Sequence, residues 1–283
     1  MPQKLYVRQI STSGIWGIIE LKSQEGRPKV TWILSFALGA VVIATATLSG
    51  IFGMAGGIVL MGAFLTILPV GSAMMLHGTT QAVSNGYRAF LTREHIDWSI
   101  SWRYISSALV ALALLSSIAF VPEKALVFIA VGSVPFIAIL LPQNLTLDIT
   151  KRGVPFICGF AITLINLVAG VAGPLLDVFF VRSNLTRHQV VATKAITQTF
   201  SHLMKLVYFG LLVHEAATAA EEELSILPWW VYLLVIPCAM LGTTLGTKIL
   251  NKITDTDFRR WSQWIVMALG SICLSRGLYL LTS

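Results

Sequence analysis

The sequence has few charged residues for its length. Only 12% of its 283 residues are Asp, Glu, Lys or Arg, whereas a soluble globular domain carries about 25%. The chain is instead 55% hydrophobic, with a mean hydropathy of +0.78. Several apolar runs approach the roughly 20 residues that cross a bilayer core. Because so few polar side chains cannot cover a water-exposed surface, the composition predicts an all-α polytopic membrane protein.

Cysteine is also scarce. The three cysteines, Cys158, Cys238 and Cys273, lie in separate apolar runs, without a CxxC pair or a Cys/His spacing typical of metal sites. We expect them to pack as small hydrophobic side chains. The sequence therefore predicts no disulfide, no metal ion and no other cofactor.

The surplus of basic residues has a membrane explanation. The net charge is +7, but Lys and Arg stand mostly at the ends of apolar runs, where they orient helices in a bilayer. We therefore expect no nucleic-acid partner. The first thirty residues lack a continuous apolar stretch before a small-residue cleavage site, so we expect no cleavable signal peptide. We interpret residues 1–30 as a surface or disordered segment.

Glycines interrupt the first apolar run. Four of the eight residues from Gly50 to Gly57 are glycine, which weakens a helix and permits close approach of backbone or ligand. The next apolar piece, Ile58 to Leu68, is too short to cross a bilayer at about 1.5 Å per residue. We expect a half-helix or re-entrant segment, whose irregular backbone must be buried in protein or line a wet cavity.

A weaker copy of this pattern follows. A second glycine break, Gly170 to Pro174, precedes another short apolar piece and a second polar-striped helix, and a shift of 114 residues places Thr79 on Thr193. We predict a first membrane repeat over residues 31–142, a linker over 143–153 and a second repeat over 154–283. Each repeat has five segments, giving about 8–10 membrane helices with half-helices included. An inverted repeat is favoured if the short pieces cross, and a parallel repeat follows if they do not.

The helices after the breaks carry polar side chains along one face. Gln81, Ser84, Asn85 and Arg88 follow the spacing i, i+3, i+4, i+7 that places residues on one side of a helix. A second face continues the same spacing over Lys194, Thr197, Gln198, Ser201, His202 and Lys205. Ionisable groups inside apolar segments cost roughly 2.5–3.5 kcal/mol each on insertion scales, so we expect both faces to line a shared cavity.

The surplus charge on these faces is positive, which favours an anionic ligand. Arg offers a planar fork of donors suited to oxyanions, and helix N-termini after Gly57 and Gly173 would add N–H groups. We predict that His77 and Asp177 are candidates for proton coupling. The helix-break glycines are Gly53, Gly56, Gly57, Gly170 and Gly173. The predicted substrate-binding residues are Thr80, Gln81, Ser84, Asn85, Arg88, Lys194, Gln198, Ser201 and His202.

Each of these residues also has a structural interpretation. Arg88, Lys194 and Lys205 lie near helix ends, from which long side chains reach lipid headgroups. The histidines can be satisfied packing residues, and Asp177 can simply pair with Lys194. Small residues in the breaks can serve close helix packing alone.

The order of these motifs resembles the TauE/SafE (TSUP) family of sulfite and organosulfonate exporters. The resemblance rests on SGIFGMAGGIVLMGAFL and MLHGTTQAVSNGYRAFLTREHIDW, then on AGVAGPLLDVFF and VVATKAITQTFSHLMKLVYFG, and it covers residues 31–281. It implies a transporter of small sulfur-containing anions such as sulfite or sulfoacetate in a bacterial inner membrane. It also implies matching roles for the break glycines and for Thr79 and Thr193. Pro174 departs from the family's more glycine-rich second break.

We therefore predict a secondary transporter, not an enzyme, that exports such anions by alternating access around a cationic midplane site. Its partners would be the substrate and the lipid bilayer, and the oligomeric state stays open. The alternatives are an anion channel and an importer of another sulfur oxyanion such as thiosulfate. A membrane-embedded enzyme is disfavoured, because the sequence has no nucleophile–base pair.

Overall fold

The computed structural model describes residues 32–52, 55–141, 147–181, 183–213, 227–250 and 255–282. Within these ranges the chain is helical, with no β-strand, which confirms the predicted all-α class. The predicted N-terminal segment, residues 1–30, lies outside the described residues, as do Gly53 and the start of the predicted linker.

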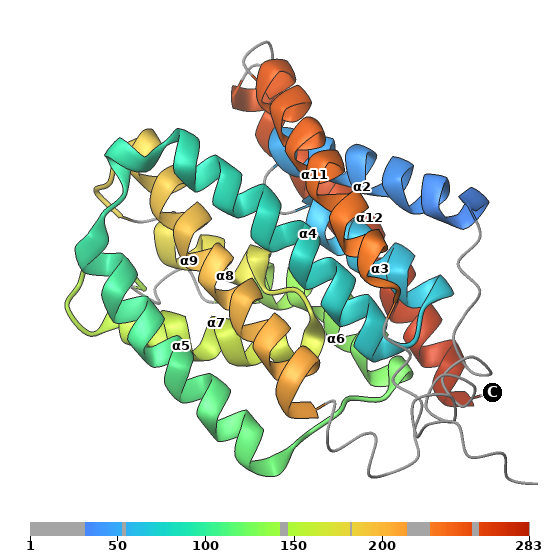
Figure 1. Cartoon of the computed structure of the whole chain (residues 1–283). Helices are drawn as coiled ribbons and strands as arrows, with labels where there is room; N and C mark the ends of the chain where they lie inside the picture. Colours follow the sequence, from blue (N-terminus) through green and yellow to red (C-terminus); the bar gives the residue numbers. More distant parts are fainter. Residues whose placement is uncertain are drawn as a thin grey trace, which may run out of the picture.

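The first set of helices ends near residue 140 (Figure 1). It comprises α2 (Trp32–Phe52), α3 (Ala55–Ile67), α4 (Val70–Leu91), the 3₁₀ turn η1 (Arg93–His95), α5 (Trp98–Ile118) and α6 (Lys124–Leu140).

The second set repeats this order of long and short elements. It comprises α7 (Val154–Ala169), α8 (Gly173–Phe180), α9 (Arg187–Val207), the π-helical turn η2 (Tyr208–Leu212), α11 (Trp229–Leu250) and α12 (Asp255–Thr282).

Three helices of the described chain are long and apolar enough to cross a membrane, within α5, α11 and α12. Shorter apolar helices lie within α2, α3, α6 and α7. The protein is thus a polytopic helical membrane protein, as the composition predicts.

The two short helices follow the two breaks. α3 has 13 residues and α8 has eight, so at about 1.5 Å per residue neither spans a bilayer core about 30 Å thick. Pro69 ends the first short piece and stands at the N-cap of α4, whereas Pro174 occupies the first turn of α8, where its missing N–H costs nothing. Gly170 closes α7 in the left-handed conformation, with φ 77°.

The first break is narrower than the sequence predicts. α2 continues through Gly50 to Phe52, and helix resumes at Ala55. Gly50 is instead a packing residue, because a Cβ there would lie 2.7 Å from the Cα of Gly246 on α11. Lipid tails are as apolar as the helices, so close approach through small residues is what holds such helices together.

Helix pairing follows one pattern in both sets. The first helix of each set packs on the fourth of the other, as α2 on α11 and α7 on α5. The third helices, α4 and α9, pack on each other, as do the fifth helices, α6 and α12.

Both of these like-with-like pairs are antiparallel. In the α4–α9 pair His77 meets Lys205, and farther along α4 Gly86 approaches Thr199, which lies earlier in α9. In the α6–α12 pair, Gly277 approaches Ala125 and Gly270, earlier in α12, approaches Gly132, later in α6.

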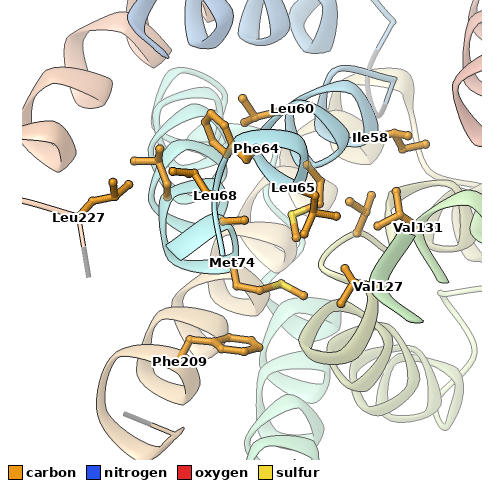
Figure 2. Close-up of a cluster of buried hydrophobic side chains, with 14 of the residues drawn as sticks. Ile58, Leu60, Phe64, Leu65, Leu68, Met74, Val127, Val131, Phe209 and Leu227 are labelled. Atoms are coloured by element: carbon orange, nitrogen blue, oxygen red, sulfur yellow. The ribbon is translucent and has the colours of Figure 1, made fainter. Parts of the chain in front are cut away.

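The interior is built around α3, which is apolar on all sides. Figure 2 shows Ile58, Phe64 and Leu65 of α3 against Met74 of α4 and Val127 of α6, all fully buried. A helix that is hydrophobic all round belongs in a core. Because α3 begins beside the polar face of α4, this packing fixes the position of the first break.

The close approach of α3 to α2 gives a test of the packing. A Cβ on Gly56 would lie 2.1 Å from the backbone oxygen of Thr45, and overpacking of this kind costs about 1–3 kcal/mol. We expect Gly56→Ala to lower the melting temperature of the purified protein in detergent by several degrees. The control is Gly39→Ala, also buried at the interface of α2 with α11, where the added Cβ would make an ordinary van der Waals contact, 3.5 Å from the sulfur of Cys238. Equal melting temperatures for the two variants would contradict the packing described here.

Candidate functional site

A small polar cavity lies where the two helix breaks meet. Its volume is about 20 Å³, which is room for about one water molecule. Both sets of helices contribute to its wall. The lining residues are Ser49, Gly57, His77, Gln81, Asn85, Val171, Ala172, Gly173, Gln198 and His202.

Helix periodicity explains how the polar side chains converge. His77, Gln81 and Asn85 are spaced by four residues on α4, and Gln198 and His202 by four on α9, so each set forms one row. Because α4 and α9 pack together, the two rows meet at the cavity. His77, Gln81, Asn85 and His202 are all buried.

Hydrogen bonds hold these side chains in place. The Asn85 amide donates to the backbone oxygen of Gln81 at 3.0 Å and to its side-chain oxygen at 3.3 Å. His77 Nε2 lies 3.1 Å from the carbonyl oxygen of Gly57. The imidazoles of His77 and His202 are neighbours, with centroids 5.5 Å apart.

The two short helices present their N-terminal turns to the cavity. Gly57 lies in the first turn of α3 and Gly173 is the first residue of α8. The first N–H groups of a helix have no partner within it and form the positive end of its dipole. Together with the side-chain amides, they give the site a surplus of donors suited to an anion's oxygens.

The predicted hydroxyl residues do not line this cavity. Thr80 donates to the backbone oxygen of Leu76 at 2.8 Å. Ser84 lies 2.6 Å from the hydroxyl of Thr243, and Ser201 lies 2.7 Å from that of Tyr104. These hydroxyls serve the helices: Ser84 links α4 to α11 and Ser201 links α9 to α5.

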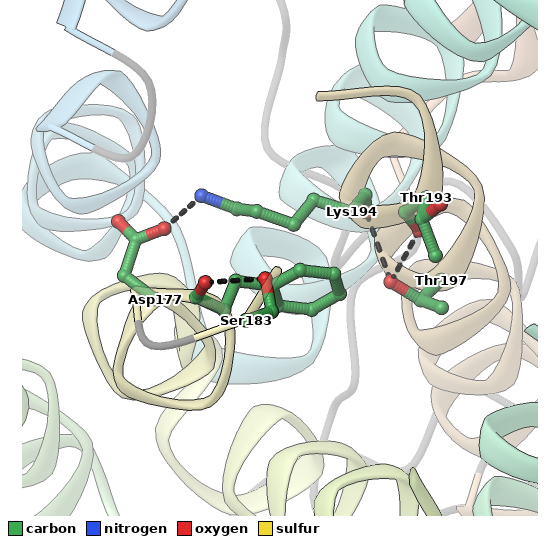
Figure 3. A network of polar contacts seen from close by, with 6 residues as sticks. Asp177, Ser183, Thr193, Lys194 and Thr197 are labelled. Atoms are coloured by element: carbon green, nitrogen blue, oxygen red, sulfur yellow. Dashed lines mark hydrogen bonds and ion pairs between the residues drawn. The ribbon is translucent and has the colours of Figure 1, made fainter. Parts of the chain in front are cut away.

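Two predicted cations also lie outside the lining. Figure 3 shows the Lys194 ammonium paired with the carboxylate of Asp177 on α8, which is the structural alternative expected for Asp177. Arg88 donates to the backbone oxygen of Ser49 at 3.3 Å. Because Ser49 lines the cavity, Arg88 supports one wall of it.

The break glycines divide between packing and lining. Gly57 and Gly173 line the cavity, and Gly56 packs against α2. Gly170 makes the left-handed turn at the end of α7.

Two polar residues beside the cavity were not among the predicted site residues. Lys205 is fully buried, and its ammonium donates to the Gly170 carbonyl oxygen at 2.6 Å and contacts His77 Nδ1 at 3.1 Å. This burial rules out its interpretation as a headgroup-binding residue. Asn166 of α7 lies 3.4 Å from His202 Nδ1, through its amide nitrogen, and its Oδ1 is buried without a hydrogen-bond partner. The sequence alone could have indicated Asn166 as a site residue, because it is an amide within the apolar run that forms α7.

The titratable residues of the described chain do not form a metal centre. Within the described ranges, no three His, Cys, Asp or Glu side chains are grouped as ligands for a metal ion. The arrangement at the cavity is one of neutral donors with a cation behind them, which suits hydrogen bonding to an oxyanion.

Comparison with known proteins identifies one family. The family model described as sulfite exporter TauE/SafE matches residues 37–272. No curated protein and no solved structure matches the chain.

The Asp177–Lys194 pair can be tested by a double-mutant cycle. Asp177→Asn leaves the largely buried Lys194 without its counter-ion, so we expect a lower melting temperature in detergent. Lys194→Gln in the same background should recover part of that loss. The side chains are 44% and 18% exposed, so the coupling should be no more than about 1 kcal/mol. If the effects of the two substitutions on the melting temperature were strictly additive, the ion pair would contribute nothing to stability and the prediction would be wrong.

Proposed function

Since the chain belongs to the sulfite exporter TauE/SafE family, we propose that it is a secondary transporter that exports small sulfur-containing anions such as sulfite or sulfoacetate. The membrane in which it acts would be the inner membrane of a bacterium. We propose transport without a catalytic step.

The observation that supports this proposal best is the cavity between the two breaks. Amide and imidazole groups from α4 and α9 face the first turns of two short helices there. A sulfonate or sulfite group has three oxygens around one sulfur, and each accepts hydrogen bonds. Gln81, Asn85, Gln198 and His202 would bind these oxygens. Thr80, Ser84 and Ser201 would hold the helices that carry them.

The charge of the substrate needs a cation close by. Lys205 contacts His77, whose imidazole lies beside that of His202 in the cavity wall. Arg88 and Lys194 lie farther along the same helices, with Lys194 partly exposed. We propose that these two attract the anion along its path and that Lys205 balances its charge in the site.

The size of the cavity implies movement during transport. Room for about one water is less than an oxyanion needs, so the site must widen when substrate enters. The conformation described here would then be a closed state between two open ones. Rocking of one half against the other is the motion by which repeat-built transporters open a central site to alternate sides.

The packing supports an inverted relation between the halves. Equivalent helices pack as antiparallel pairs, α4 with α9 and α6 with α12. A two-fold axis that reverses a helix along the membrane normal must lie in the membrane plane. We propose that residues 31–142 and 154–283 form inverted repeats joined by residues 143–153.

Substrate binding tests the proposed site. We expect sulfite, sulfoacetate or thiosulfate to stabilise the purified protein in thermal-shift and calorimetric titrations. Gln198→Leu removes hydrogen bonds to a charged group, worth about 1.5–3 kcal/mol, and should weaken binding by one to two orders of magnitude. The control is Thr199→Val, since the Thr199 hydroxyl bonds the backbone of its own helix at 2.7 Å. If taurine, sulfate and these anions all leave the wild type unchanged, the proposal fails.

Transport kinetics separate a transporter from an anion channel. In proteoliposomes we expect the flux of labelled sulfoacetate or thiosulfate to saturate with concentration. Unlabelled anion on the opposite side should accelerate exchange, because a site that returns loaded avoids the separate step in which it returns empty. Flux that rises linearly and shows no counterflow would favour the channel.

A further inference from the structure

Lys205 is a buried cation without an acidic partner. Its side chain has 0% exposure. Within the described residues the ion pair joins Lys194 to Asp177, and no carboxylate lies within 4 Å of the Lys205 ammonium. Its ammonium contacts only two acceptors, the carbonyl oxygen of Gly170 and Nδ1 of His77. A charge buried in this way is strongly disfavoured unless an anion comes near it.

The hydrogen-bond pattern fixes how many protons Lys205 and His77 can share. The Gly57 carbonyl can only accept, so His77 Nε2 carries a hydrogen and donates to it. In the neutral imidazole the lone pair of Nδ1 then faces Lys205 and accepts from it. A second ring hydrogen, placed on Nδ1, would point at the N–H groups of the ammonium and be repelled by them. The two side chains therefore carry a single positive charge at most.

The contacts of Lys205 survive loss of that charge. Two acceptors need two N–H groups, and an ammonium supplies three whereas a neutral amine supplies two. When the ammonium gives its proton to water, one N–H bond breaks and its electron pair stays on Nζ. The amine still donates to Gly170 and His77. The site can thus change its charge without losing its geometry.

The same contacts join the two helix breaks. The chain of bonds runs from the Gly170 carbonyl through Lys205 and His77 to the Gly57 carbonyl. One end lies in the break before α8 and the other in the first turn of α3. His77 also lines the cavity. A change of charge on Lys205 therefore acts where the anion would bind and where the halves meet.

We propose that Lys205, positioned by His77 and Gly170, is a proton-binding site whose proton travels with the transported anion. The proposal rests on the transport function proposed above. The anion binds well when Lys205 is an ammonium, and Lys205 releases its proton to water when the anion leaves. Proton and anion then move in the same direction. A divalent sulfur anion with one proton carries a single negative charge, which an inside-negative potential drives outward.

The titratable groups around Lys205 have partners of their own, so Lys205 is the group that remains to bind the proton. α4 presents His77, and α9 itself adds His202, whose Nδ1 faces the amide nitrogen of Asn166 from α7. From α5 the Tyr104 hydroxyl binds Ser201, and from η2 the Tyr208 hydroxyl donates to Phe120. Asp177 of α8 is paired with Lys194. Each of these groups other than His77 has its hydrogen-bond or ion-pair partner elsewhere than on Lys205.

The first test measures binding against pH. The probes are sulfoacetate, thiosulfate and sulfate, whose acid groups are fully ionised between about pH 6 and pH 9 and so carry no protons themselves. For the wild type we expect the Kd of a bound probe to rise as pH rises, by up to about tenfold per pH unit once Lys205 loses its proton. Lys205→Arg keeps a permanent charge, so its Kd should not depend on pH. Lys205→Met should bind at least tenfold more weakly at low pH.

The second test follows protons during transport. In proteoliposomes with a trapped pH indicator, inward movement of a probe through the wild type should acidify the lumen by one proton per anion. Lys205→Arg should still exchange labelled for unlabelled anion but should move no protons. The matched control is Lys248→Met, which removes an exposed lysine at the end of α11 and should behave as the wild type.

The outcomes separate this proposal from the transport function. Transport of a probe by the wild type with no change in luminal pH overturns the proton site and leaves the function intact. Proton movement that persists in Lys205→Met does the same. If the wild type neither binds nor transports any sulfur anion, the function itself fails and this proposal with it. The wild-type measurement decides the matter even where a Lys205 variant does not fold.

Discussion

In the apolar interior of a bilayer, every backbone N–H and C=O needs a partner within the protein. A continuous helix meets this need by itself, but this chain interrupts two helices in its interior. The carbonyl of Gly170 is bonded by Lys205 and that of Gly57 by His77. The Gly170 carbonyl lies past the end of α7 and has no partner within that helix, so this break requires a donor such as Lys205, whereas the Gly57 carbonyl lies in the first turn of α3 and His77 adds to its helix bond. The helices are arranged so that both breaks reach the polar rows of α4 and α9.

Close helix packing is the second condition for this arrangement. The hydrophobic effect gives little attraction between helices that are already in lipid, so small residues and interhelical hydrogen bonds take over that role. Gly50 meets Gly246 where α2 packs on α11, and Gly159 leaves no room for a Cβ against Tyr104 where α7 packs on α5. The hydroxyl pair of Ser84 and Thr243 adds a polar contact between α4 and α11. Polar side chains that seem destined for a ligand are thus partly used to hold the helices together.

The sequence predicts the architecture better than the roles of single residues. α7 begins at Val154, where the predicted second repeat begins, and ends at Ala169, directly before the predicted second break, and the short helices follow both breaks, because apolar length and glycine clusters are properties of the local chain. Periodicity also places Gln81, Asn85, Gln198 and His202 on shared faces, and all four line the cavity. It cannot say which part of a polar face turns toward a neighbouring helix. Ser84 and Ser201 therefore bond other helices, Lys194 reaches Asp177, and Lys205 lies deeper than its place near a helix end implies.

The π-helical turn after α9 has a consequence for how the second polar row can move. In a π turn the helix holds one more residue than an ordinary α-helical turn does. The π turn here begins at Tyr208, three residues after Lys205. If the extra residue passed along the helix, the part that it crossed would rotate by about 100°, the angle that one residue subtends in an α-helix. Such a shift exchanges hydrogen bonds one at a time and unfolds nothing. α9 therefore has an internal source of rotation, independent of any hinge between the two halves.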